Sequence, residues 1–147
     1  MAHLLDSNMM LRWANKEDAE RPLALSAMRS LGRQREVLHS TPQNYTEFWS
    51  SATRPVAVNG LSLIPAHVAQ LVKQLRTLFP LLPDTGAIFE EWLRGVMSAA
   101  VSGRQVHDAR LVAVMLAHGI THILTFNVKD FQRYAVFGIT AVHPANV

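Results

Sequence analysis

Every position from Leu111 to Ala117 carries an apolar side chain. The helix predicted over Val106 to His118 therefore has no polar face along this stretch, and such a helix is stable only where other elements cover all its sides. Gly119 follows directly and suits the left-handed residue that commonly ends a helix. We therefore expect this helix to be buried in the interior of the fold.

Short apolar strands alternate with helices along the rest of the chain. Strands are predicted at His3–Leu5, Glu36–His39, His122–Phe126 and Ile139–Val142, with a candidate short strand at Leu81-Leu82. Helices are predicted at Asn8–Trp13, Pro22–Arg33, from Pro42 with Thr41 as N-cap, at Pro65–Leu78 and at Gly86–Ala100, with a loop at Pro55–Gly60 and a turn or short helix at Asn127–Arg133. This alternation predicts an α/β fold with a mostly parallel sheet and helices on its faces.

Four of these helices carry apolar residues at near-helical spacing, which predicts the sides that face the core. The predicted apolar stripes are Leu25, Met28 and Leu31; Tyr45, Phe48, Trp49 and Ala52; Val68, Leu71, Val72, Leu75 and Leu78; and Ile88, Phe89, Trp92, Val96 and Met97.

The bulk composition narrows the class of protein. A chain of 147 residues with 49% hydrophobic and 17% charged residues fits one globular domain, here residues 1–147. The formal net charge of +3 is compatible with a polyanionic partner. The absence of cysteine excludes disulfides, thiolate zinc sites and a cysteine nucleophile. No signal peptide or membrane span is expected, so a cytoplasmic location is the default.

Polar groups follow two predicted strands and stand on two helices. Asp6 comes directly after the first strand and Asn127 after the His122 strand, while Asp108 lies in the first turn of the buried helix and Glu47 on the Pro42 helix. In parallel sheets, sites form outside the carboxyl ends of the strands. Each residue alone also has a structural explanation: an N-cap for Asp6, a dipole contact for Asp108, a surface acid for Glu47 and a turn for Asn127.

Taken together, the three acids point to a metal site. Carboxylates near an apolar core repel one another unless a cation neutralises them, and hard oxygen ligands suit Mg²⁺, with Mn²⁺ as a substitute. Such ions serve phosphoryl transfer. The sequence does not show whether the three acids meet in space.

Four short motifs stand in a fixed order along the chain. They are Leu4-Leu5-Asp6-Ser7-Asn8; Thr41-Pro42 with Tyr45-Thr46-Glu47-Phe48-Trp49; Val106-His107-Asp108-Ala109-Arg110-Leu111; and Leu124-Thr125-Phe126-Asn127-Val128-Lys129-Asp130-Phe131. In order and spacing this set resembles a PIN domain, and more narrowly the VapC-type toxins of bacterial toxin–antitoxin pairs. The resemblance runs from the first strand to the last.

The resemblance implies a three-layer α/β/α sandwich, Mg²⁺-dependent endoribonuclease activity, a homodimer and a small antitoxin that blocks the site. It places Asp6, Glu47 and Asp108 on the acids of the family, and Asn127 where many relatives have a fourth acid. Asn127 is therefore interpreted as a neutral residue that orients a water or ligand. Asp130 is interpreted as a turn or capping residue, with a contact to the metal through water as the alternative. Ser7 and Thr125 would offer hydroxyls to the groups around the metal ligands.

These features together yield a mechanistic hypothesis. Asp6 and Asp108 hold Mg²⁺, Glu47 helps directly or through water, and a metal-activated water cleaves the RNA phosphodiester to leave a 5′-phosphate and a 3′-hydroxyl. His107 is interpreted as structural or as a substrate contact. The cations near the motifs are candidate phosphate contacts or ordinary surface charges: Arg12, Arg104, Arg110, Lys129 and Arg133.

Other readings remain open. A housekeeping RNA-processing PIN nuclease would carry the same acids, and a non-catalytic PIN-like binding module would keep the pocket as a scaffold. A phosphatase-like site needs a second aspartate where this chain has Asn8, and a phospho-receiver needs a paired acid beside Asp6. Neither of these last two patterns is present.

Overall fold

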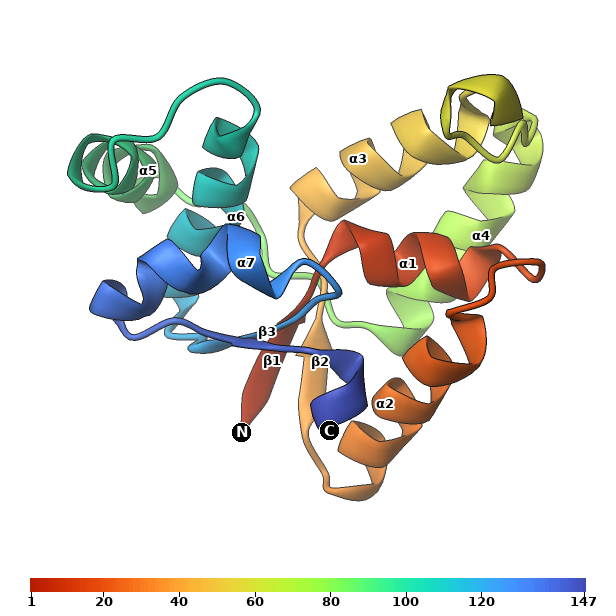
Figure 1. The fold of residues 1–147 in the computed structure, drawn as a ribbon, viewed down its shortest axis with the longest axis horizontal. Helices are drawn as coiled ribbons and strands as arrows, with labels where there is room; N and C mark the ends of the chain where they lie inside the picture. Colours follow the sequence, from red (N-terminus) through yellow and green to blue (C-terminus); the bar gives the residue numbers. More distant parts are fainter.

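The centre of the fold is a four-stranded sheet in which all neighbouring strands run parallel (Figure 1). The computed structural model describes residues 1–147. Its strands are β1 Ala2–Leu5, β2 Val37–His39, β3 His122–Leu124 and β4 Thr140–Val142. Their order is β2-β1-β3-β4, so β1 and β3 are the two inner strands. The predicted parallel sheet is confirmed, and Asp6 and Thr125 stand at the carboxyl ends of its inner strands.

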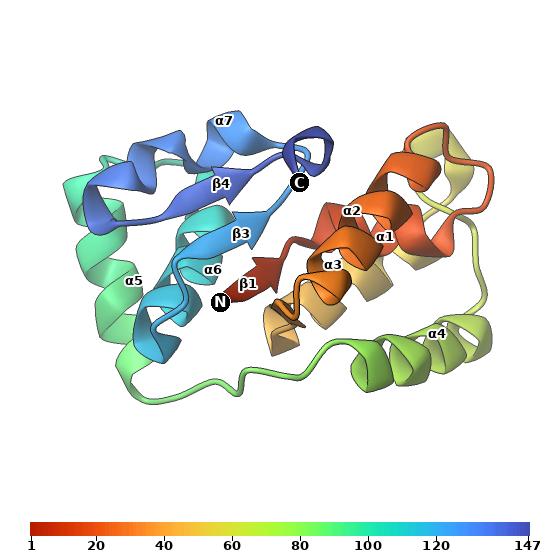
Figure 2. The ribbon, with the colours of Figure 1, turned by 90° about the horizontal axis from the view of Figure 1, so that it is seen from below.

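Helices cover both faces of the sheet. They are α1 Ser7–Ala14, α2 Arg21–Arg33, α3 Pro42–Thr53, α4 Pro65–Leu78, α5 Ala87–Ser98, α6 Gln105–His118 and α7 Val128–Phe131. Short 3₁₀ helices span Val56–Val58, Gln132–Phe137 and Pro144–Asn146. Figures 1 and 2 show α1 to α4 gathered on one side of the sheet and α5 to α7 on the other, which makes the three-layer α/β/α sandwich. None of these helices is both long and apolar enough to span a bilayer.

Successive residues of the inner strands supply two separate cores. Leu4 and Ile123 pack into the cluster that contains α6, whereas Leu5 and Leu124 pack into the cluster that contains α1, α2 and α3. This alternation is the period of two expected of strands that are buried on both faces.

The apolar helix predicted at the outset is α6, and its burial is confirmed. The five residues from Leu111 to Met115 are all buried, and α5 packs along the helix on the side away from the sheet. Gly119 ends α6 at a φ of 69°, a left-handed conformation that glycine adopts without a side-chain penalty.

The caps at the carboxyl edge of the sheet fix where α1 and α3 begin. Thr41 caps α3 in a reciprocal capping box with Asn44, and Pro42 occupies the first turn as predicted. The Asn44 side chain also donates to the Ser7 hydroxyl at 3.1 Å. The two helix N-termini are therefore tied together beside β1.

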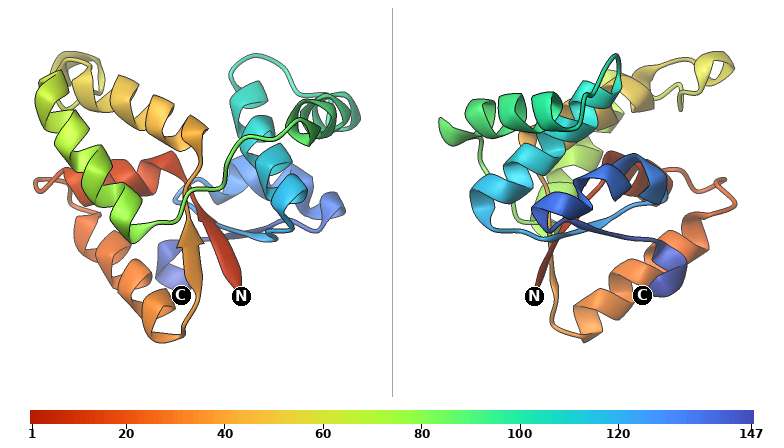
Figure 3. Two further views of the ribbon diagram at one scale, coloured as in Figure 1. Left: turned by 180° about the vertical axis from the view of Figure 1, so that it is seen from behind. Right: turned by 60° about the vertical axis from the view of Figure 1, so that its left-hand side comes forward.

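The candidate strand at Leu81-Leu82 is wrong. Only one bridge forms there, between Ser40 and Leu81, because the segment from 79 to 86 is a crossing connection. It leaves α4 on one side of the sheet and reaches α5 on the other, passing the end of β2 (Figure 3). The Ser40 N–H donates to the Pro80 carbonyl at 2.9 Å.

Four residues of the predicted apolar stripes lie outside the core. Phe89 and Met97 on α5 are 60% and 73% exposed, Leu78 at the end of α4 is 54% exposed, and Trp49 on α3 is 38% exposed. Helix α5 packs mainly on α6. It therefore buries Ile88 but leaves its outer side open.

Candidate active site

Asp6 lies at the carboxyl end of β1 and is almost completely buried. Its Oδ1 accepts the Ser7 N–H at 2.7 Å, and its Oδ2 accepts the Thr125 hydroxyl at 2.7 Å and the Asn8 amide at 3.2 Å. Asp6 is therefore the N-cap of α1, the structural role weighed for it above. The same bonds aim the carboxyl group at the sheet edge and hold it there.

Asp6 and Asp108 carry strongly raised pKa values. Burial raises the pKa of Asp6 to about 6, against the hydrogen bonds from Thr125 and Ser7, with the charges of Glu47 and Asp130 adding to the rise. Burial also raises the pKa of Asp108 to about 7, followed by the charges of Asp6, Asp130 and Glu47. Acids from four separate elements thus act on one another at this edge of the sheet.

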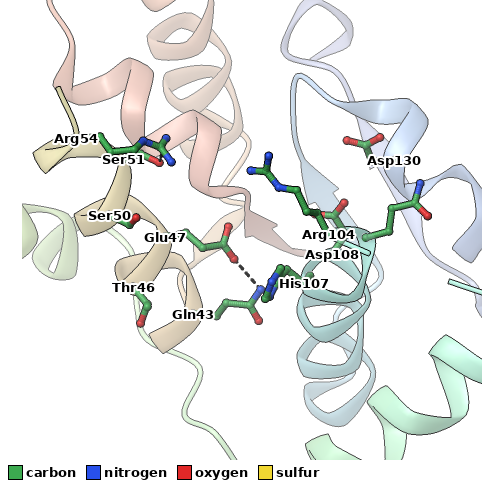
Figure 4. Close-up of a pocket in the computed structure, with 11 residues that line it drawn as sticks. Gln43, Thr46, Glu47, Ser50, Ser51, Arg54, Arg104, His107, Asp108 and Asp130 are labelled. Carbon is green, nitrogen blue, oxygen red and sulfur yellow. Dashed lines mark hydrogen bonds between the residues drawn. The ribbon is translucent and has the colours of Figure 1, made fainter. Parts of the chain in front are cut away.

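A polar groove of about 660 Å³ opens between α3 and the first turn of α6 (Figure 4). No hydrophobic residue lines it. Its walls are Gln43, Thr46, Glu47, Ser50, Ser51 and Arg54 from α3, then Arg104, Gln105, His107 and Asp108 around the start of α6, and Asp130 from α7. Glu47 and Asp108 therefore face the same space from opposite walls, as Figure 4 shows.

Ser7 and Thr125 both stand beside Asp6. The Thr125 hydroxyl donates to Asp6 and accepts the Asn127 N–H at 2.9 Å. Ser7 contacts Asp6 through its backbone, while its hydroxyl accepts from Asn44. Both residues are buried, and the Ser7 N–H and the Thr125 hydroxyl are the groups that orient the Asp6 carboxyl group.

Asn127 and Asp130 are placed differently by the turn that starts α7. The Asn127 side chain is exposed, makes no hydrogen bond and does not line the groove, while its carbonyl accepts the Asp130 N–H at 3.1 Å. Asp130 lies three residues further along and lines the groove. The role proposed for Asn127 stays a prediction, and the structure adds Asp130 to the acids that face the groove.

The candidate cations differ in what they contact. Arg104 lines the groove, and Arg110 pairs with Asp84 at 3.3 Å and not with the adjacent Asp108. The Arg12 guanidinium lies 4.2 Å from the centre of the Phe126 ring. Arg133 donates to Gln105 and Lys129 is exposed outside the groove.

None of the four acids around the groove forms an ion pair with Lys, Arg or His. Carboxylates without a cationic partner, two of them with raised pKa values, are a donor set that suits a hard divalent cation. In this conformation no three acidic or histidine side chains lie close enough to hold one ion. The residues thus fit such an ion in their chemistry, and shared ligation requires the side chains to draw together.

Part of the α3 wall was not predicted from the sequence. Gln43 stands one turn before Glu47 and donates to it at 2.6 Å, while Ser50, Ser51 and Arg54 continue the polar side of the helix away from the acids. The spacing of four residues between Gln43 and Glu47 is the sequence signal that could have predicted this contact on one helix face.

Comparison with models of known families identifies the family to which this fold belongs. A family model described as the PIN domain matches residues 3–136. The chain belongs to the PIN domain family. Among curated proteins, no sequence match is found. The PIN domain match spans all four motifs, from Asp6 to Asp130.

Solved structures share this fold at low sequence identity. The structure of VapBC2 from Rickettsia felis bound to a promoter DNA fragment aligns with a TM-score of 0.72 at 12% identity, covering 97% of this chain and 98% of the other. VapBC-1 from nontypeable Haemophilus influenzae gives 0.72 at 15% identity, with 99% of each chain covered. VapC20 of Mycobacterium tuberculosis, a toxin that cleaves the sarcin-ricin loop, gives 0.62 at 19% identity over 84% of this PIN domain and 87% of its own chain.

Proposed function

We propose that this PIN domain protein is a Mg²⁺-dependent endoribonuclease. The observation that carries the proposal is that Glu47, Asp108 and Asp130 line one polar groove, that the charge of the buried Asp6 acts on Asp108, and that no cation pairs with any of these acids. The raised pKa values of Asp6 and Asp108 mean that their negative charges are unfavourable in the metal-free fold, and a bound cation would offset that cost.

In this proposal Asp6 and Asp108 hold the ion, with Mn²⁺ as a substitute, and Glu47 assists from the opposite wall. When bound, the ion would activate a water and offset the negative charge that grows on the phosphate. Hydrogen bonds from the Thr125 hydroxyl and the Ser7 N–H would hold the Asp6 carboxyl group in its orientation when it serves as a ligand.

The groove also suits an RNA strand. Arg54 and Arg104 line it from opposite walls and neither pairs with an acid, so both are free to contact phosphates. The serines and threonine of the α3 wall offer hydroxyls to sugar and phosphate oxygens. Phe48 is in the core and the Tyr45 hydroxyl donates to Ser40, so we assign no base stacking to these two rings.

The test is cleavage of single-stranded RNA by purified wild type and by Asp6→Asn. We expect cleavage with Mg²⁺ or Mn²⁺, none with EDTA, and none by the variant. Products should carry a 5′-phosphate and a 3′-hydroxyl. Products ending in a 2′,3′-cyclic phosphate would overturn the mechanism, and no cleavage of any RNA together with no bound Mn²⁺ would favour a binding module.

The biological role proposed here is that of a toxin with a small antitoxin partner. The VapBC structures above support it, because they are complexes of this fold. Growth arrest on expression, relieved by the product of a short neighbouring gene, would support the toxin role over RNA processing. Normal growth on expression of active enzyme would favour the housekeeping nuclease.

We further propose a homodimer. Phe89, Leu93 and Met97 repeat every four residues and form an exposed apolar strip on α5. Strips of this kind commonly mark contacts between subunits.

A further inference from the structure

The Gln43 side chain connects the two walls of the groove. Its Nε2 donates to Glu47 Oε1 at 2.6 Å on its own helix and to the His107 carbonyl at 2.7 Å on α6. Its Oε1 accepts from Arg110 Nη1 at 3.2 Å. Figure 4 shows the carboxamide reaching from α3 toward His107, with the bond to Glu47 dashed.

These contacts leave the amide only one orientation. A carboxylate and a carbonyl can only accept hydrogen bonds, and an arginine can only donate them. The nitrogen must therefore face Glu47 and His107, and the oxygen must face Arg110. Arg110 is held in turn by Asp84. A carboxylate or an apolar side chain at position 43 cannot reproduce this set of bonds.

Glu47 depends on this amide for its position. Its carboxylate makes no other hydrogen bond and no ion pair in the protein. Without Gln43, the side chain would sample several rotamers on a partly open helix face. The second bond of the same amide fastens the backbone immediately before Asp108. One side chain thus controls both the direction of Glu47 and its separation from the opposite wall.

We propose that Gln43 is a positioning residue that holds Glu47 in register with Asp108 for binding of a divalent cation. This inference rests on the proposed function. Groups that orient metal ligands typically change metal affinity by about 10- to 100-fold when they are removed. Because Glu47 is one ligand among several, we expect a loss of about tenfold, at the low end of that range.

The experiment measures Mn²⁺ binding to the metal-free full-length protein by electron paramagnetic resonance of the free ion. Gln43→Met keeps the length of the side chain and removes the amide. Gln74→Met makes the same change on an exposed site of α4, outside the groove. We expect the Kd for Mn²⁺ to rise about tenfold in Gln43→Met and to stay at the wild-type value in Gln74→Met.

Repeating the measurement in a Glu47→Ala background distinguishes the loss of Glu47 positioning from a general loosening of the groove. If Gln43 acts through Glu47, Gln43→Met should change the Kd by less than about twofold once Glu47 is gone. An equal loss in both backgrounds would overturn the proposal. Arg110→Met, which removes the donor that orients the amide, provides a second route. It should weaken binding in the wild type and have no further effect in Gln43→Met.

The possible failures are distinguishable. Wild type that binds Mn²⁺ while Gln43→Met binds it equally well overturns the role of Gln43 and leaves the nuclease proposal standing. Wild type that binds no Mn²⁺ overturns the metal-dependent function, and the role of Gln43 with it. Thermal melting of each metal-free variant checks that it is folded. If Gln43→Met does not fold, an Arg110→Met protein that binds Mn²⁺ as tightly as wild type overturns the proposal.

Discussion

The buried carboxyl group of Asp6 makes the metal-free protein less stable as the pH rises. Its pKa is about 6 in the folded protein against an ordinary value of 3.8. At about 1.4 kcal/mol per pKa unit, ionising Asp6 in the native state costs about 3 kcal/mol. Because the folded pKa is the higher one, this stability is fully present below pH 3.8 and is lost as the pH rises through 6.

Asp6→Asn should therefore be more stable than wild type at pH 8 in EDTA. The asparagine oxygen still accepts the Ser7 N–H, and the Thr125 hydroxyl can turn to accept from the new amide. The contact with Asn8 is lost, at about 1 kcal/mol. The net gain at pH 8 is about 2 kcal/mol. At pH 4.5 wild type regains about 2 kcal/mol through protonation, so the two proteins should unfold at about the same urea concentration.

Urea unfolding followed by tryptophan fluorescence measures both differences. Asp18→Asn is the matched control, because Asp18 also accepts a backbone N–H, from Glu20 at 2.8 Å, but lies away from the groove. We expect no gain in stability from Asp18→Asn at pH 8. If Asp6→Asn proves less stable than wild type by the same amount at pH 4.5 and pH 8, the Asp6 carboxylate is a favourable cap and the reasoning fails.

Four further predictions follow from the same structure. Millimolar Mg²⁺ should raise the melting temperature of wild type but not of Asp108→Asn, as seen by calorimetry; an equal rise in both would remove Asp108 from the metal ligands. Arg54→Ala should raise KM for RNA about fivefold with little change in kcat, whereas an unchanged KM would exclude Arg54 from the RNA path. Phe48→Ala, at a fully buried site, should lower the free energy of unfolding by about 3–5 kcal/mol in urea, and a loss below about 1 kcal/mol would contradict the core assignment. Met97→Lys should shift sedimentation toward the monomer, and an unchanged profile would place any dimer contact elsewhere.

Local signals predicted the layers of the fold. The uninterrupted apolar run in α6 has only one stable environment, between other layers, and Gly119 marks its end. Thr41 and Pro42 are strong start signals for α3, and both act as expected. Phe89 and Met97 were wrongly predicted to lie in the core. Apolar spacing identifies the apolar side of a helix, but not whether another element covers that side. Helix α5 lies at the outside of the fold, with α6 as its main neighbour.

The site was predictable at the strand ends and less so between helices. Asp6 follows β1 directly, so the parallel sheet puts it at the edge where sites form. β3 ends at Leu124, earlier than predicted, and the Asn127 backbone then bonds to Thr125 and Asp130. The groove is reached by Asp130, one turn later. The sequence left two roles open for Asp130, a turn residue or a contact near the metal, because its position depends on the angle at which α7 leaves the sheet.

The hydrogen bonds of Gln43 across the groove likewise could not be predicted from the sequence. Its partner His107 is 64 residues away, and the distance between α3 and α6 is set by the packing of two different cores on opposite faces of the sheet. Contacts between separately packed elements carry no periodic signal along the chain. Such contacts can be identified only once the positions of both elements in the fold are known.

Asp6 shows that a structural role and a site role can belong to one carboxyl group. The sequence offered helix cap and metal ligand as alternatives, yet capping α1 is what fixes the Asp6 carboxyl group at the sheet edge. Capping alone does not require a carboxylate, since asparagine and serine cap helices equally well. Among these residues only aspartate adds a full negative charge, and its burial near Glu47 and Asp130 is unfavourable without a cation. We expect a neutral cap at this position to stabilise the metal-free fold, so the presence of aspartate supports the proposal that a cation binds there.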